Sequence, residues 1–377
     1  MEHGDAGRGG ARPIVVRVPV EPVEAAVEAD AVDAVARAGE VVVRGPLFGV
    51  AAQGPEDGAR WRVVIAVINP CPQLARDSLN SKLWFRAKDE AKDRAERREL
   101  LAAVARLESE RVDDLEAGGT RYRVVRAEEY AGSGPDGIEL PRPTDPEPLV
   151  PDWTRGARGP DIDDALLLDP DEPVPPTRAL EQLALRGLRY SGARYPEDVL
   201  ADSRRALDSH PDVLLLPPTF TVVEQTGPRN WEPVSGPHVS AHEARKSMDF
   251  TLTWAWPRMR GLIPVDADMG ADARSRVADA VAAGAPEAEL AEYAGAADAL
   301  RVGRVNRLEF QGTAYQIART RRLLRWGPDG PEGPRPSDSN SQEPTRIHLA
   351  LDEDGRVVPE EHPEDDPEGL PGDLPGD

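Results

Sequence analysis

The stretch GTRYRVVRAEEYAGSGPDGIELPRPTD at residues 119–145 returns as GTAYQIARTRRLLRWGPDGPEGPRPSD at residues 312–338. Both belong to a longer ungapped match, in which 111–145 aligns with 304–338 at an offset of 193 and 17 of the 35 positions are identical. A period this long indicates a duplicated domain, because solenoid repeats are several times shorter. The length of 377 residues agrees, since about 150 residues per domain gives two or three units.

The sequence around this repeat predicts the same order of elements twice. Periodicity and turn residues predict, in the first half, a helix over 21–38, strands over 41–53 and 61–68, one long helix or two joined helices over 71–110, and a hairpin over 111–130. The corresponding segments of the second half are 202–225, Trp231, 240–254, an Ala-rich stretch over 265–303 and a hairpin over 304–326. Residues 12–19 predict a further strand and 177–192 an extra helix without a counterpart.

We therefore expect an α+β protein of two tandem pseudo-symmetric copies, each with a helix, two strands, helices and a two-stranded hairpin. Each copy would form an antiparallel sheet backed by helices. The expected divisions are a first repeat domain (12–130), an acidic Pro-rich linker (131–177), a second repeat domain (178–330) and a Pro-rich acidic tail (331–377) that is disordered at its end.

The negative charge is concentrated in the linker and the tail. The formal net charge of the chain is −22, of which residues 131–177 carry −8 and residues 331–377 carry −11. The two repeat domains are close to neutral, so the acidity does not describe their surfaces. Like charges in Pro-rich sequence favour extended, solvated arms, which could contact a protein partner.

Cysteine content and hydropathy bear on the cellular compartment. Cys71 is the only cysteine, which excludes an intramolecular disulfide and fits a reducing cytoplasm. The start MEHGDAGRGG has no apolar core, so we expect no signal peptide. The apolar runs at 63–68 and 213–218 are too short to cross a bilayer, so no membrane partner is expected.

The repeated turn and proline segment is the main candidate for binding. Arg142 and Arg335 each stand between two prolines, with Asp145 and Asp338 three residues later. One interpretation is a pair of Arg/Asp sites that grip an anion or a peptide. The other is an extended segment that covers a sheet edge, with Arg and Asp paired to each other; turn chemistry alone explains these residue types and favours it.

Other residues give weaker signals. His238 and His242 are four apart and would share the face of a helix, yet HVSAHE is not a zinc-binding HExxH motif, so no metal is expected. Cys71, between two prolines, has no evident catalytic partner. Asp161, Asp163 and Asp164 fit a solvated acidic run. No nucleotide-binding or hydrolase motif occurs, so no cofactor is expected and enzymatic activity is left open.

Four arginines form a basic stretch in the second hairpin: Arg319, Arg321, Arg322 and Arg325, next to Trp326. Basic and aromatic residues together can bind nucleic acid, but the acidic arms argue against it. An alternative is that this stretch receives the acidic tail of the same chain.

Four long strings resemble a known family: LNSKLWFRAKDEA (79–91), HPDVLLLPPTFTVVE (210–224), RMRGLIPVDAD (258–268) and RLLRWGPDGPEGPRPSD (322–338). The chain resembles, over 12–358, a family of actinobacterial proteins classed as a domain of unknown function. The resemblance implies a cytoplasmic bacterial protein and assigns no functional residue.

Two functions remain open from these observations. The first is a cytoplasmic protein-binding or scaffold protein, with its acidic Pro-rich arms and Arg142, Asp145, Arg335 and Asp338 at the contact. The second is an enzyme or small-molecule sensor with one site at the interface of the two halves, where pockets often form. A cleft between the halves lined by His238 and His242 would favour the second.

Overall fold

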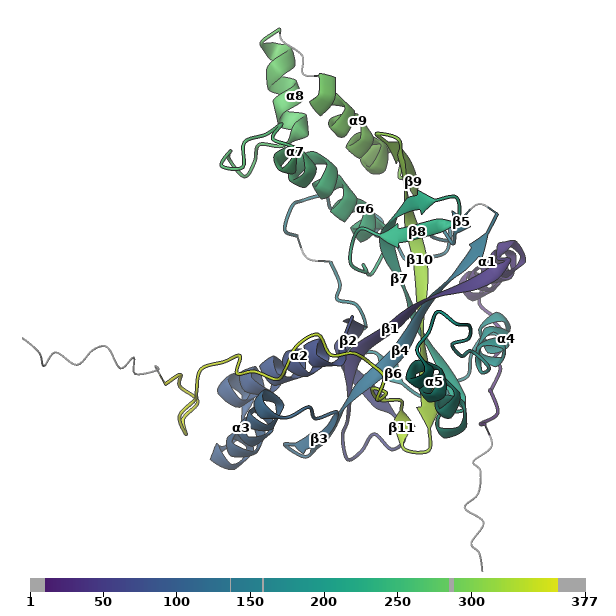
Figure 1. The fold of residues 1–377 in the computed structure, drawn as a ribbon, viewed down its shortest axis with the longest axis vertical. Helices are drawn as coiled ribbons and strands as arrows, with labels where there is room; N and C mark the ends of the chain where they lie inside the picture. The colour runs from purple at the N-terminus through teal and green to yellow at the C-terminus, as the bar shows by residue number, and fades with distance from the viewer. Residues whose placement is uncertain (1–10, 136, 158, 285–287, 359–377) are drawn as a thin grey trace, which may run out of the picture.

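The computed structural model describes residues 11–135, 137–157, 159–284 and 288–358. Figure 1 shows long, curved strands crossing near the middle of the molecule, with helices at both ends and along one side. The protein is an α+β protein, as predicted, and its strands form one antiparallel sheet that contains both halves of the chain.

The first half follows the predicted order. Pro22 stands in the first turn of α1 and Pro72 in the first turn of α2, where a missing N–H costs nothing. The predicted 71–110 segment is two helices, because a π-helical turn at Arg86–Glu90 interrupts it and Asp93 then caps a new N-terminus. The elements are α1 (Pro22–Arg37), β1 (Glu40–Gln53), β2 (Trp61–Asn69), α2 (Pro72–Phe85), α3 (Arg94–Ser109), β3 (Asp114–Ala117) and β4 (Thr120–Gly134).

The second half adds helices around a similar pair of long strands. Its Ala-rich stretch forms two helices, and the N-terminus of α8 is fixed by a capping box between Asp272 and Ser275. The elements are α5 (Glu197–Ser209), β7 (Asp212–Gly227), β8 (Asn230–Pro233), α6 (Ala241–Phe250), a π-helical turn (Thr251–Ala255), α7 (Trp256–Met259), α8 (Ala273–Ala282), α9 (Ala288–Val302), β9 (Arg307–Phe310) and β10 (Thr313–Gly327).

The centre of the sheet is the contact between β4 and β10. The strand order is β6-β2-β1-β4-β10-β7-β8, in which β6 is the short strand Leu167–Leu168. Strand β4 pairs with β10 antiparallel, with Glu129 opposite Arg322. The short strands β3 and β5 (Gly137–Ile138) pair with β4, while β9 and β11 (Gly330–Pro331) pair with β10. The two halves therefore share main-chain hydrogen bonds.

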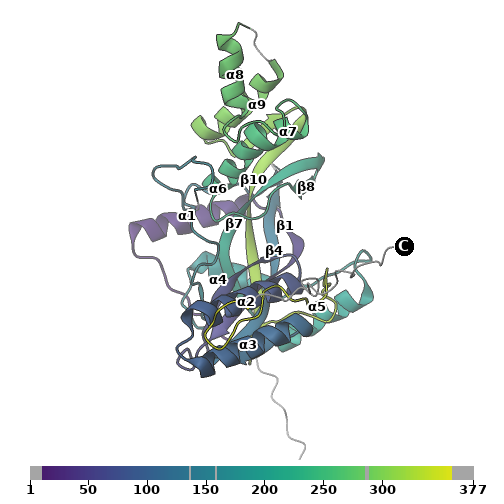
Figure 2. The same ribbon diagram turned by 90° about the vertical axis from the view of Figure 1, so that its left-hand side faces the viewer.

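Apolar side chains pack at both ends of the sheet and in its middle. Helices α2 and α3 cover one end, and α6 to α9 cover the other, as Figure 2 shows. Leu83 and Leu100 are fully buried in the first cluster, Leu252 and Ala297 in the second. A third cluster at the middle, around Trp326, joins residues of both halves.

The structure differs from the prediction at the N-terminal segment and the extra helix. Residues 12–19 form a single bridge, Val16 with Val174, instead of a strand, because Pro13 and Pro19 have no N–H to donate. The extra helix, α4 (Pro176–Leu185), ends seven residues before the predicted end. Gly187, which disfavours helix, follows two residues after this end.

The linker and the tail follow the body of the protein closely. In the described part of the linker, regular structure is limited to the end of β4, β5, β6 (Leu167–Leu168) and the start of α4. Residues 339–358 of the tail run along α2, shown in yellow in Figure 1. The predicted disorder of the tail's end concerns residues 359–377, which lie outside the described residues.

Candidate functional site

The repeated proline segments form two straps, here defined as strap 1 (residues 139–147) and strap 2 (residues 332–340). Asp145 of strap 1 accepts a hydrogen bond from Arg319 Nε of β10 at 2.9 Å. Asp338 of strap 2 accepts one from Arg126 Nε of β4, also at 2.9 Å. Each strap therefore binds the long central strand of the other half.

The four predicted site residues also bind within their own straps. The Arg142 main-chain N–H donates to Asp145 at 2.7 Å, and that of Arg335 donates to Asp338 at the same distance. The Nε atoms of the two arginines donate to Glu139 and Glu332, each at 2.7 Å. The structure thus brings Arg142 to Asp145 and Arg335 to Asp338, with contacts that stabilise the straps.

The buried charges around strap 2 shift one another's pKa. Burial lowers the pKa of Arg126, but the carboxylates of Glu128 and Asp338 outweigh it, and the net pKa is raised. Burial raises the pKa of Glu128, but Arg126 and Arg335 outweigh it, and the net pKa is lowered. These groups are therefore held in their charged forms.

The basic stretch of β10 lies in the interior. Arg322 is fully buried and contacts Asp163 through both terminal nitrogens, at 2.5 and 2.8 Å. Arg325 is also buried and donates to the carbonyls of Arg186 and Leu188. These arginines do not form a surface for nucleic acid. The interpretation of Asp163 as a solvated acid is wrong, because the linker returns to the centre of the sheet.

The part of the tail that the structure describes beyond strap 2, residues 341–358, has no hydrogen bond or ion pair with this stretch. In its described part, Asn340 contacts Arg76 at 3.0 Å and Glu353 contacts Arg94 at 3.0 Å, so it binds the helices of the first half. The acidic groups that reach β10 come from the linker and from Glu181 of α4.

His238 and His242 do not form one site. His238 precedes α6 and pairs with Phe220 in a β-bridge, so the helical spacing that would align the two imidazoles does not apply. His242 is buried, with Nε2 3.1 Å from the carbonyl oxygen of Asp152. Among the described residues, no group of three or more His, Cys, Asp or Glu side chains is placed to hold a metal ion.

A wide hollow separates β2 and α2 from the segment before α6. Its volume is about 870 Å³, and His238, Glu243, Lys82 and linker residues around Asp161 line it. His242 is not part of it. The structure therefore has a cleft between the halves, but with only one of the two predicted histidines.

Cys71 is buried at the N-terminus of α2, where its Sγ lies 3.2 Å from the hydroxyl oxygen of Ser341. Burial raises the pKa of the thiol, but hydrogen bonds from Ser341 and the first turn of α2 outweigh it, and the net pKa is lowered. The tail covers this thiol.

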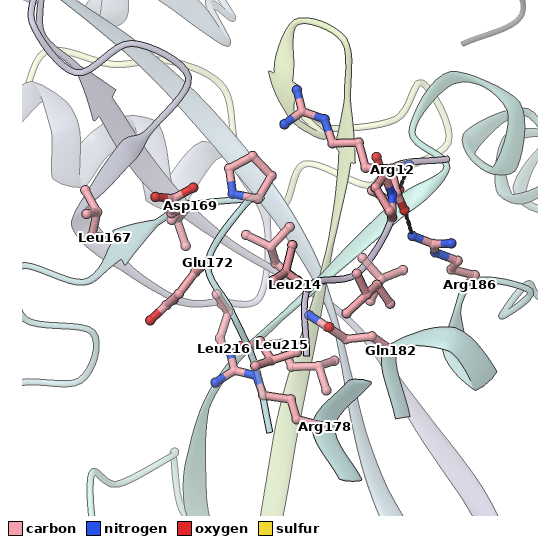
Figure 3. A pocket seen from close by; sticks show the side chains of 18 of the residues that line it. Arg12, Leu167, Asp169, Glu172, Arg178, Gln182, Arg186, Leu214, Leu215 and Leu216 are labelled. Carbon is pink, nitrogen blue, oxygen red and sulfur yellow. Dashed lines mark hydrogen bonds and ion pairs between the residues drawn. The ribbon is translucent and has the colours of Figure 1, made fainter. Parts of the chain in front are cut away.

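A more enclosed cavity of about 200 Å³ lies where the N-terminal segment and the linker meet the second half. We call it the α4 cavity. Its walls are residues 12–15, residues 166–174 with β6, one face of α4 and the outer edge of β7 (Figure 3). Val174, Val213 and Leu215 are buried around it. Four separate segments of the chain are needed to form it.

Gln182 of α4 is the uncharged polar side chain in the lining of this cavity. Its exposed fraction is 6%, and no hydrogen bond joins its amide to any residue in the described part of the chain. Figure 3 shows the amide extending from α4 toward Leu214–Leu216. The amide atoms are not sealed in the protein interior but open onto the cavity, where water or a ligand can pair with them.

Main-chain groups of two extended segments also face the α4 cavity. The carbonyl oxygen of Leu215 accepts from Arg178, so its N–H points to the same outer edge of β7, where strand pairing starts only at Phe220. Across the cavity, the N–H and C=O of Ile14 have no partner among the described residues. The cavity therefore offers donors and acceptors beside an apolar wall.

Charged side chains stand at the edge of the α4 cavity. Arg186 is paired with Asp212 at 3.1 Å, and Arg12 with Asp171 at 3.1 Å. Arg178 and Glu172 also line it.

Sequence reasoning missed this cavity. The one available signal was that α4 has no counterpart in the first half.

Comparisons with known proteins identify a family and no characterised relative. In the described residues, no helix is long and apolar enough to cross a bilayer. No curated protein and no solved structure matches the chain. A family described as a family of unknown function matches residues 21–341, which is most of the chain. The chain thus belongs to the family of unknown function DUF5954.

Proposed function

We propose that this protein binds a small molecule in the α4 cavity and acts as a sensor or carrier of that molecule. The observation that carries the proposal is the amide of Gln182, which lines the cavity on a side chain that is only 6% exposed and hydrogen-bonds no other described side chain. Its donor and acceptor, with the main chain of Ile14 and Leu215, suit a molecule that has hydrogen-bonding groups next to an apolar part. A cavity of about 150 Å³ already accepts a benzene-sized molecule.

The position of the cavity supports a sensing role. Its walls come from the N-terminal segment, the linker and the second half, so a bound molecule would hold these three parts together. Binding to the folded form alone raises stability with ligand concentration, by about 2.7 kcal/mol at a hundred times the Kd. In the bound state the linker would be held more tightly against the second half.

The experiment is a thermal-shift screen with amino acids, nucleosides and short carboxamides, followed by native mass spectrometry of hits. A ligand of the cavity should raise the Tm of the wild type, and the Gln182→Leu variant should lose this response while remaining folded. The matched control, Leu183→Gln, changes an exposed position on the same helix and should respond like the wild type. An equal response in Gln182→Leu would contradict the proposal.

A second candidate is a protein-binding scaffold, favoured by an exposed apolar segment. Val18, Val20 and Val23 are 69%, 81% and 76% exposed in a row before and at the start of α1. Large apolar side chains gathered on a surface are typical of protein contacts. In this proposal the partner binds the segment 18–23, while Arg142, Asp145, Arg335 and Asp338 keep the straps in place.

The scaffold proposal is tested by affinity purification of the tagged protein from its host, compared with a Val20→Asp/Val23→Asp variant. A partner of this surface should be lost from the variant. A set of co-purifying proteins that does not change would contradict the proposal.

We also propose that the two halves arose by duplication and that the protein acts in the cytoplasm. The 17 identical positions and the equivalent contacts of Asp145 and Asp338 support the first. The single Cys71 supports the second. Fractionation of host cells tests the compartment, and a signal outside the cytoplasm would contradict it.

A further inference from the structure

A separate cavity lies beside strap 1, between the C-terminal end of α1 and the turn that joins β4 to β5. Its volume is about 330 Å³. Much of its lining is apolar and includes Ala34, Ala38, Ile138, Leu140, Pro141 and Pro143. We call it the strap cavity.

Arg142 lines the strap cavity with two uncommitted nitrogens. Its Nε donates to one oxygen of Glu139 at 2.7 Å. The other oxygen of Glu139 is taken by Arg321 Nη2 at 2.8 Å. The terminal nitrogens of Arg142 consequently have no partner in the described part of the chain, although only 11% of the side chain is exposed.

The corresponding arginine of strap 2 is fully committed. Arg335 binds both oxygens of Glu332, at 2.7 and 3.1 Å, and its third nitrogen lies 3.4 Å from Glu128. Two residues of the same type in the same sequence context therefore differ in what they can still bind. Arg142 alone keeps donors for a ligand.

The space next to strap 2 is also filled by the chain itself. Arg325, which aligns with Gly132 at the offset of 193, is buried and donates to the carbonyls of Leu188 and Arg186. In the first half Gly132 has no side chain, and a Cβ there would stand 3.2 Å from a carboxylate oxygen of Glu139 and 3.4 Å from the Cβ of Ala38. The glycine thus lines the strap cavity without putting a side chain into it.

Two further arginines belong to the lining of the strap cavity. Arg37 and Arg307 line the same cavity. Arg37 lies in the last turn of α1, where a cation offsets the negative end of the helix dipole. Among the described residues of the lining Glu139 is the acidic one, and its carboxylate is already shared by Arg142, Arg319 and Arg321.

We propose that the strap cavity binds a small organic carboxylate, with its carboxylate on the two terminal nitrogens of Arg142 and its apolar body against Ala38, Ile138 and Leu140. A guanidinium with two parallel N–H groups matches a carboxylate in a bidentate geometry. The apolar lining selects against small hydrated anions, which would lose water without gaining contacts. This site is independent of the α4 cavity.

The test uses fluorine NMR with 4-fluorobenzoate as the probe on the full chain. The wild type should bind it with millimolar or better affinity, and Arg142→Gln should weaken binding about tenfold or more. Arg335→Gln is the matched control, because that arginine is committed to Glu332 and Glu128, and it should leave the affinity unchanged. Thermal unfolding of each variant establishes that it is folded.

Measurements on the wild type keep the proposal testable if a variant does not fold. 4-Fluorobenzamide, a neutral probe of the same shape, should not bind, and inorganic phosphate should not displace 4-fluorobenzoate. Absence of 4-fluorobenzoate binding, equal binding of the amide, displacement by phosphate or an unchanged affinity in folded Arg142→Gln would each overturn the proposal. Gln182→Leu should bind the probe normally, which separates this outcome from that of the α4 cavity.

Discussion

The pair of Asp163 and Arg322 is the most deeply buried ion pair in the described structure, with both side chains fully shielded from solvent. Its two members are 159 residues apart. Asp163 also accepts the main-chain N–H of Val67, so one linker carboxylate joins β2, β10 and the linker. An isolated buried charge is very unfavourable, and this makes each partner depend on the other.

Replacing Asp163 by Ala should lower the free energy of unfolding by about 3–5 kcal/mol, because Arg322 would stay buried without its counter-ion. Urea unfolding followed by circular dichroism measures this loss. Asp161→Ala, two residues earlier at an exposed position, is the control and should change stability by no more than about 0.5 kcal/mol. Similar losses in both variants would show that the pair is not the cause.

The burial of His238 predicts that the stability of the protein depends on pH. Burial lowers its pKa below the ordinary value of 6.5, so the unfolded chain binds the proton more readily than the folded one. Stability should therefore fall as the pH decreases below about 6.5. His238→Gln lacks this contribution. The free energy of unfolding of the variant should therefore fall less than that of the wild type between pH 7 and pH 5. Urea titrations at both pH values measure the difference; a constant difference would contradict the prediction.

The helices and long strands were predictable from local patterns, whereas the paths of the linker and tail were not. Alternation and turn residues placed β1, β2 and the β3–β4 hairpin within a few residues. The contact of Asp338 with Arg126 spans 212 residues, and no local pattern reports it. The α4 cavity was missed for the same reason, because its walls are brought together only by folding.

The tail segment 345–358 shields part of α2. The ring of His348 stacks on Trp84 at a centroid distance of 4.6 Å, and the Trp84 indole donates to the Leu349 carbonyl at 3.0 Å. A chain that ends at Pro344 should expose this indole and shift its fluorescence emission to longer wavelength. The same truncation in a Trp84→Phe background isolates the signal, and it should then show no shift. If truncation leaves the emission spectrum of the chain with Trp84 unchanged, the tail does not cover this indole.

The two halves hold each other through exchanged straps as well as through β4 and β10. A cut in the linker should therefore not separate them. Leu149 and Val150 are 99% and 84% exposed, which makes this point suitable for an engineered protease site. After cleavage, both fragments should elute together at the size of the intact chain and separate only in denaturant. Separation in native buffer would show that the straps contribute little to the association of the two halves.

Strap exchange has a consequence for biosynthesis. Arg126 finds the second of its two carboxylates on Asp338, which leaves the ribosome 212 residues later. At about 5–20 residues per second, the nascent first half waits about 10–40 s with Glu128 as the partner of this guanidinium and without its second carboxylate. During that interval it should be recognised by chaperones and cleaved by proteases, so codon choice and chaperone supply would set the yield of this protein as strongly as its final stability does.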